Sequence, residues 1–216
     1  QRIDLLGVRK EDLPLMWADL NRAGLVSGHA YSKGLRTVKT CVGSEFCRFG
    51  TQDSTGLGIR LEKLLWGSWT PHKVKLGVSG CPRNCAEATC KDVGIVCVDS
   101  GYNISVAGAA GMEVKQTEHL AATPSEDEAV EIVTAFIQLY REHARYLDRP
   151  YKWVAKVGLD WVIAQVVDDP RNRRALVKRF ETSQSVYRRD PWAEHSTPSE
   201  TPRWAPLADL TLEAAE

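Results

Sequence analysis

The chain has 216 residues, of which 43% are hydrophobic, and its 28 basic and 28 acidic side chains give a formal net charge of zero. A neutral chain has no overall field to attract nucleic acid or a membrane surface, so we expect neither as a partner. No uncharged run approaches the ~18 apolar residues of a membrane-spanning helix. No signal peptide is visible, and because the chain starts at Gln1 we expect it to be a piece of a longer protein.

The first half predicts strands and helices that lead into cysteines. Residues 11–23 begin with acids and a proline, which is typical of a helix start. Residues 35–42 predict a strand that reaches Cys41. Asp53 predicts the cap of a helix that stops at Gly67. Residues 73–79 alternate polar and apolar side chains, and so predict a second strand that runs into Cys81.

Four of the six cysteines form two close pairs, TCVGSEFC (C-x5-C) and SGCPRNC (C-x3-C). Four thiolates are what a cubane iron–sulfur cluster needs, one for each iron. A structural zinc site also uses four ligands, although its pairs are usually closer than the first pair here. A disulfide framework suits short secreted chains. The spacing alone leaves these alternatives open, and metal-binding cysteines favour a reducing, cytoplasmic setting.

The other two cysteines are predicted to hold no metal. Cys97 lies in an alternating run at residues 93–98 that predicts a buried strand, where a free cysteine behaves as a small hydrophobe. Cys90 follows Cys85 by five residues and is the one further thiol near the proposed ligands; we expect no ligand role for it.

The second half predicts two more strands and then helices. Residues 103–107 and 112–115 predict strands joined by a glycine-containing hairpin turn. Ser125 opens a capping box for a long helix with an apolar face that reaches Leu147, before Pro150. Two further helices are predicted, one with its apolar side chains at Trp153, Val157 and Trp161 and one over residues 171–188. From Asp190, four prolines predict a mobile tail.

These elements predict an α+β fold, in which a mixed sheet with covering helices extends to about residue 120 and a helical C-terminal extension follows. Charge is unevenly distributed over it. Residues 32–91 hold ten basic and four acidic side chains, whereas the rest of the chain is acidic by the same margin. This excess predicts either a pocket for a strongly anionic ligand or ordinary solvated faces.

Three runs carry a family resemblance: TCVGSEFCRFG, LWGSWTPHKVK and SGCPRNCAEATCKD. They resemble the sirohaem-dependent nitrite and sulfite reductases, and most closely the C-terminal part of the large subunit of assimilatory NAD(P)H-dependent nitrite reductases. The resemblance implies a 4Fe-4S cluster and a sirohaem as cofactors. The implied cluster ligands are Cys41, Cys47, Cys81 and Cys85. The implied sirohaem contacts are Arg48, Arg83, Asn84 and Cys85, whose sulfur also bridges to the sirohaem iron.

The resemblance also implies the reaction, a six-electron reduction of nitrite to ammonia in nitrate assimilation. Lys73 and Lys75, two residues apart on the predicted strand, are the candidate catalytic cations that bind the oxyanion. Two alternatives remain: a sulfite reductase haemoprotein module, and a metal-stabilised domain without catalysis.

The implied organisation has four parts. Residues 1–31 are the end of a ferredoxin-like half-domain with a linker helix, and residues 32–122 are the sirohaem- and cluster-binding domain. Residues 123–189 are a helical extension packed on it, and residues 190–216 are a proline-rich flexible tail. The resemblance implies FAD and NAD(P)H for the full-length subunit, on an N-terminal module; this chain has no dinucleotide-binding motif and is not expected to bind them. A small subunit and a homodimer are further expected partners.

Overall fold

The computed structural model describes residues 4–27 and 33–196. These divide into two compact units, one of residues 33–188 and one that joins Asp4–Ser27 to residues 189–196. No helix of the described residues is long and apolar enough to cross a membrane.

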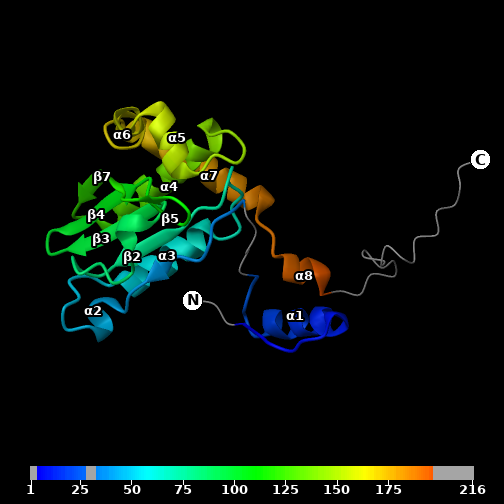
Figure 1. The fold of residues 1–216 in the computed structure, drawn as a ribbon. Coiled ribbons are helices and arrows are strands. Elements are labelled where there is room, and N and C mark those ends of the chain that lie inside the picture. Colours follow the sequence, from blue (N-terminus) through cyan, green and yellow to red (C-terminus); the bar gives the residue numbers. More distant parts are fainter. Residues whose placement is uncertain (1–3, 28–32, 197–216) are drawn as a thin grey trace, which may run out of the picture. The chain divides into compact units, whose positions relative to one another are not determined.

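The larger unit is built on a five-stranded mixed sheet in the order β1-β2-β3-β4-β7 (Figure 1). β1 (Lys39–Thr40), β2 (Leu76–Ser79) and β3 (Val93–Val98) are parallel, whereas β4 (Gly101–Val106) and β7 (Glu118–Thr123) continue the sheet in antiparallel pairing. The predicted mixed sheet is confirmed.

Helices cover one face of this sheet. α3 (Ser54–Leu65) contacts β1 and β2, and α4 (Glu126–His143) contacts β4 and β7. The short helix η2 (Ala88–Cys90) lies against β2 and β3 on the other face. A Cβ on Gly94 would lie 2.1 Å from the carbonyl oxygen of Ala88, so glycine is what lets η2 approach so closely.

Four strand predictions need correction. The strand predicted over residues 35–42 is the two-residue β1, with an isolated bridge between Leu35 and Val74 before it. β2 begins at Leu76 rather than at residue 73, and all four of its residues are buried because the sheet is covered on both faces there. β4 pairs with β7, which the sequence analysis missed because its Glu-His-Leu-Ala-Ala-Thr lacks a strong strand pattern. The predicted hairpin partner forms instead a separate pair of two-residue strands, β5 (Ala109–Ala110) and β6 (Val114–Lys115).

The helical extension packs into the same core as the sheet. It consists of α4, α5 (Pro150–Val157), α6 (Leu159–Val166) and α7 (Pro170–Tyr187). α4 ends at His143 rather than at residue 147. The helix predicted around Trp153 and Trp161 is two helices, because Gly158 takes a positive φ of 86° between them.

The smaller unit contains three helices among its described residues: η1 (Lys10–Asp12), α1 (Leu13–Arg22) and α8 (Pro191–His195). Asp190 caps α8 through the backbone NH of Trp192 and also accepts hydrogen bonds from Asn21 and from the NH of Ser27. The start of the predicted tail is therefore helical, and the rest of it lies outside the described residues. Residues 1–3 and 28–31 of the predicted half-domain and linker, and residue 32 of the predicted cluster-binding domain, also lie outside the described residues.

Candidate metal and anion site

The sheet brings the first cysteine of each pair to one edge. β1 and β2 are parallel, with Thr40 opposite Val78, so their carboxyl ends meet. Cys41 follows β1 directly, and Cys81 follows β2 after Gly80. The NH of Cys41 donates to the carbonyl of Val78 at 3.3 Å, which continues the strand pairing into the cysteine loop.

Gly80 joins the two cysteine loops. Its NH donates to Cys41 Sγ at 3.1 Å, and its carbonyl oxygen accepts from the NH of Thr51 at 2.7 Å. A Cβ on Gly80 would lie 2.8 Å from the Cα of Gly43, so the backbones of the two loops touch here. The loop of the first pair contains α2 (Gly43–Phe46), and the NH of Cys47 closes it by donating to the carbonyl of Gly43.

The four predicted ligands are graded in exposure: Cys81 is buried, Cys41 and Cys47 are half-buried, and Cys85 is exposed. All are free thiols. Within the described residues, no three Cys, His, Asp or Glu side chains converge on a point where one metal ion would bind. A cubane cluster takes one thiolate for each of its four irons, and here the four thiols come from two loops whose backbones touch at Gly80.

The thiols of Cys41 and Cys97 have opposite environments. Burial raises the pKa of Cys41, but its hydrogen bonds with the Ser54 hydroxyl and from the Gly80 NH outweigh burial and leave this pKa below its ordinary value. A lowered thiol pKa favours the thiolate that a metal binds. Burial in β3 raises the pKa of Cys97 to about 12, so that thiol stays protonated. Cys97 is a core residue, as predicted.

Two of the predicted sirohaem contacts are exposed arginines that share one aromatic ring. The guanidinium carbons of Arg48 and Arg83 lie 4.5 and 3.9 Å from the centroid of Phe49. Arg48 comes from the first cysteine loop and Arg83 from the second, so Phe49 holds a cation of each loop beside the cysteines. Paired guanidinium groups suit a ligand that carries carboxylates.

Asn84 is used inside its own loop. Its Oδ1 accepts from the NH of Ala88 at 2.8 Å and lies 3.0 Å from the Ser79 hydroxyl, while its Nδ2 donates to Thr89 at 2.7 Å. Its φ of 55° is one that asparagine tolerates better than most residues. These bonds make Asn84 a residue that shapes the second cysteine loop.

Lys73 and Lys75 lie before β2, not on it, in an extended segment in which Val74 forms an isolated bridge with Leu35. Within the described part of the chain, neither lysine forms a salt bridge. Burial lowers the pKa of Lys75, and the charges of Lys73 and Arg149 lower it further. The charge of Asp92 acts on the pKa of Lys75 in the opposite direction. Two ammonium groups without a salt bridge are suited to binding an anion.

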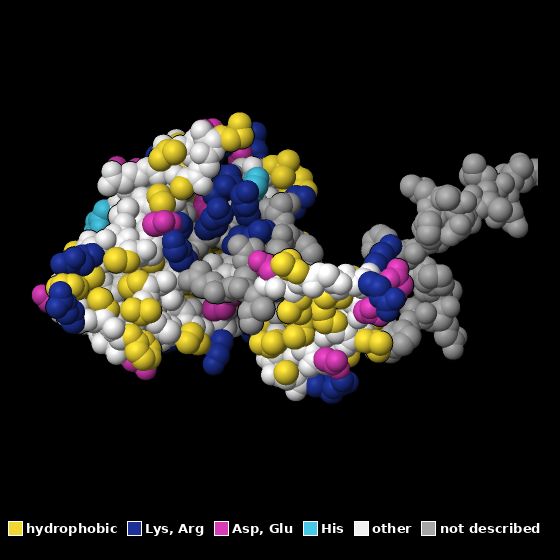
Figure 2. All heavy atoms as spheres, turned by 60° about the horizontal axis from the view of Figure 1, so that its bottom comes forward, with side chains coloured by type: hydrophobic (Ala, Val, Ile, Leu, Met, Phe, Trp, Pro, Cys, Tyr) yellow, Lys and Arg dark blue, Asp and Glu magenta, His cyan; other side chains and the backbone are white. Residues whose placement is uncertain are grey.

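A wider cationic surface surrounds these lysines. Burial lowers the pKa of His72, and four cations add to the effect: Arg149, Lys73, Lys33 and Lys152. Figure 2 shows Lys and Arg side chains gathered on one face of the larger unit. The basic side chains of residues 32–91 thus form one surface with Lys152 of α5 and Arg149, the residue before α5.

The sequence analysis missed two acidic residues of this region, one of which is buried and the other of which bridges two lysines. Asp92 is fully buried and binds Arg149 through both carboxylate oxygens. Glu87 bridges Lys39 and Lys91 at 2.8 and 3.0 Å. An acid directly before an apolar strand was the one available signal for Asp92.

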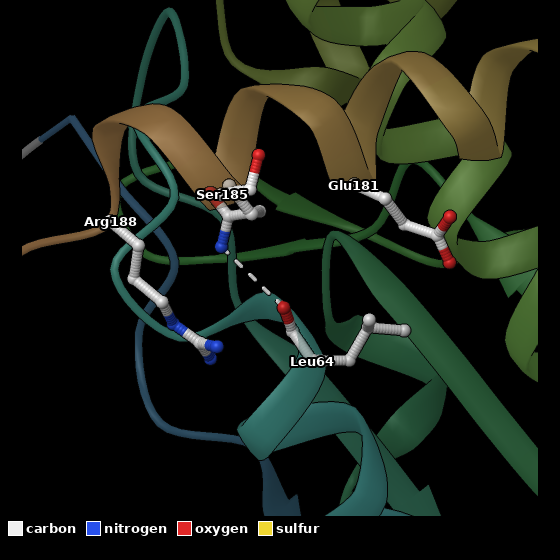
Figure 3. A pocket seen from close by; sticks show the side chains of 5 residues that line it. Leu64, Glu181, Ser185 and Arg188 are labelled. Atoms are coloured by element: carbon white, nitrogen blue, oxygen red, sulfur yellow. Dashed lines mark hydrogen bonds between the residues drawn. The ribbon is translucent and has the colours of Figure 1, made fainter.

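A shallow pocket lies away from these residues (Figure 3). It is lined by Leu64, Glu181, Gln184, Ser185 and Arg188, from the end of α3 and from α7. Cys41 is instead near Ser54, at the start of α3. Ser54 and Leu64 are ten residues, or about 15 Å, apart along α3. The pocket is therefore too far from Cys41 to take part in the chemistry of the cysteines.

Comparison with known proteins identifies the family. The model of the nitrite and sulphite reductase 4Fe-4S domain matches residues 31–174. The chain belongs to this family. An iron–sulfur cofactor follows from the membership.

Relatives of the 4Fe-4S domain family include a nitrite reductase [NAD(P)H] of Bacillus subtilis, 50% identical over 90% of this chain and 24% of that protein. An assimilatory-type sulfite reductase of Nitratidesulfovibrio vulgaris is 37% identical over 74% of this chain and 72% of that protein. The crystal structure of dissimilatory sulfite reductase I aligns with 76% of this chain and with 61% of its own chain, at a TM-score of 0.63 and 14% identity. The two proteins therefore share the fold. The chain spans about a quarter of the Bacillus relative.

Proposed function

We propose that this chain is the catalytic module of a nitrite reductase, in which a 4Fe-4S cluster and a sirohaem reduce nitrite to ammonia with six electrons. The observation that carries the proposal is the meeting of the two cysteine loops at Gly80, beside Arg48 and Arg83. The identity to the Bacillus nitrite reductase supports nitrite as the substrate.

The proposed ligands of the cluster are Cys41, Cys47, Cys81 and Cys85. Cys85 is the exposed thiol of the set, which suits the further role of bridging to sirohaem iron. Sirohaem, when bound, supplies the redox chemistry at its iron. Its carboxylates give Arg48 and Arg83 an anionic partner.

Lys73 and Lys75 are the proposed substrate cations. Their ammonium groups would hold nitrite and stabilise negative charge as the oxygens leave as water. The lysines act either on sirohaem of the same chain or, in a homodimer, on that of the partner.

Replacing Lys73 or Lys75 with methionine keeps the aliphatic stem and removes the charge. Loss of one such cation is expected to lower kcat about a hundredfold, or ~3 kcal/mol, as measured with an artificial electron donor. Lys178→Met, an exposed lysine of α7, is the matched control. Near wild-type rates in both variants, with cofactor retained, would refute the role; loss of sirohaem would instead place the lysines in its carboxylate shell.

The visible spectrum of the purified protein tests the proposal as a whole. Protein made with sirohaem synthesis intact should absorb strongly in the visible and contain cluster iron, whereas a zinc-stabilised domain without catalysis would be colourless. The second candidate function is sulfite reduction, favoured by the sulfite reductase of which this chain covers 72%. Comparing kcat/KM for nitrite and sulfite decides between them.

The remaining partners belong to the whole protein. We expect an N-terminal module with FAD and NAD(P)H to supply electrons, a small subunit to complete the enzyme, and nitrate assimilation in the cytoplasm to be its setting. The name of the Escherichia coli relative, a nitrite reductase (NADH) large subunit, supports a nicotinamide electron donor and a second, smaller subunit.

A further inference from the structure

The segment that carries Lys73 and Lys75 is held at both ends by groups from distant parts of the chain. At its start, the NH of His72 donates to the Tyr140 hydroxyl at 3.1 Å, and the carbonyl of Pro71 accepts from the NH of Leu147 at 3.0 Å. At its end, the NH of Lys75 donates to a carboxylate oxygen of Asp92 at 2.8 Å. The two lysines lie between these anchors.

Asp92 is itself held by Arg149. The carboxylate is fully buried, and Arg149 Nη2 lies 2.8 and 2.9 Å from its two oxygens. Burying two charges costs several kcal/mol in desolvation, so a buried ion pair often stabilises a protein no more than apolar side chains would. A contribution to stability is therefore a weak explanation for this pair. The hydrogen bond that Asp92 accepts from the Lys75 NH suggests instead that the pair fixes the position of the Lys75 backbone.

The anchors share one strip of chain. Tyr140 donates its hydroxyl proton to the carbonyl of Asp148, the residue before Arg149, while its oxygen accepts from His72. Leu147, Asp148 and Arg149 thus connect α4 and α5 to both ends of the lysine segment. The charge of Lys73 lowers the pKa of Lys75, so the two lysines repel each other, and the fixed anchors hold the segment that carries both.

We propose that Asp92, Arg149 and Tyr140 are positioning residues, which fix the course of residues 71–75 and so aim Lys73 and Lys75 at the anionic substrate. This inference rests on the proposed function of the two lysines. Arg149 binds Asp92 with its fork of donors, so its charge is matched within the protein and the lysines are left to bind the anion. The helical extension is then part of the substrate site.

The test uses the complete protein with its cofactors and two substitutions. Asp92→Asn keeps the shape of the side chain and removes the charge that holds Arg149; Tyr140→Phe keeps the buried ring and removes only the hydroxyl. Hydrogen exchange at the NH groups of His72 and Lys75 should accelerate by about tenfold to a hundredfold, the factor for losing a hydrogen bond to a charged group, with less effect for Tyr140→Phe. KM for nitrite should rise and kcat should fall, with sirohaem and iron content unchanged.

Arg173→Met is the matched control. Arg173 is also a buried arginine, 3.0 Å from a carboxylate oxygen of Glu128, but none of its contacts is with residues 71–75. It should lower the melting temperature without changing KM or the exchange of the two NH groups.

Two results would overturn the inference: unchanged exchange at His72 and Lys75 in both variants, or faster exchange with kinetics equal to those of Arg173→Met. The lysine role itself is judged separately, from Lys73→Met and Lys75→Met. If those keep wild-type kinetics, the proposed function of the lysines fails, whatever the anchors do.

Discussion

Cys41 and Cys97 show how the surroundings of a thiol decide its chemistry. Cys41 receives hydrogen bonds at a loop that meets a second loop, and its pKa is lowered. The side chain of Cys97 in β3 is buried in the core, and burial raises the pKa of its thiol to about 12. The same residue type is a proposed metal ligand in one place and a small hydrophobe in the other.

Serine substitutions separate these two roles. Cys41→Ser and Cys85→Ser should lose cluster iron, and Cys85→Ser should also alter the haem spectrum, because its sulfur is the proposed bridge. Cys97→Ser should keep the iron and lower the free energy of unfolding by about 1–3 kcal/mol, the cost of an unpaired buried hydroxyl. Iron analysis and denaturant unfolding measure both effects; a full cluster in Cys41→Ser would contradict the ligand assignment.

Gly80 is expected to be as important for the cluster as a ligand. In Gly80→Ala the new methyl group would lie 2.8 Å from the Cα of Gly43 and 3.1 Å from the carbonyl of Gln52, so the two cysteine loops would have to separate. The variant should lose cluster iron. Gly111→Ala, where nothing lies within 4 Å of the added Cβ, should bind iron normally. Equal iron content in the two variants would show that the loops need no such close contact.

At the scale of elements, local signals located the helices better than the strands. The cap at Asp53 and the cap at Ser125 are confirmed, since each side chain accepts a hydrogen bond from the first turn of its helix. Strand limits were less accurate. β7 was missed and β2 is shorter than predicted, because strand pairing depends on a partner that is distant in sequence.

Glu87 links β1 to the residues after η2, and its ion pairs predict a pH dependence. Hydrogen bonds from Lys39 and then Lys91 lower the pKa of Glu87 from 4.5 to about 2. A carboxylate with a lowered pKa stabilises the fold above the ordinary value, and this contribution is lost as the pH falls from 4.5 toward 2. Melting temperatures of wild type and Glu87→Gln should therefore differ at pH 7 and converge as the pH falls toward 2.

Salt should weaken this effect, since the carboxylate is exposed to solvent. Glu45→Gln, an exposed acid of α2, should show no such convergence. A Glu87→Gln difference that persists unchanged to the acid end would contradict the ion-pair explanation.

At the scale of the whole molecule, the sheet and the helical extension share one core. Trp153 of α5 is 1% exposed and packs its ring against those of Phe136, Tyr140 and Trp161. The same core includes Ile95 and Ile104 of the sheet. The extension is therefore part of the larger unit rather than an addition to its surface.

Trp153→Ala should destabilise the larger unit by about 3–5 kcal/mol, because it removes a large buried ring. Denaturant unfolding followed both by the absorbance of the proposed cofactors and by circular dichroism should give a single transition. Tyr187→Ala, at an exposed position of α7, should change little. Loss of the helical signal in Trp153→Ala at a lower denaturant concentration than the cofactor signal would show that the extension unfolds independently.

The sequence by itself determined the features that depend on a few neighbouring residues: the cysteine pairs, the helix caps and the buried character of Cys97. It also determined the α+β class and the family. Only the tertiary structure decided how the parts meet. Arg149 and Asp92 are 57 positions apart, and Gly80 and Cys41 are 39 apart. No local pattern encodes such pairs, because the sheet and the helical extension bring them together only when the whole core packs.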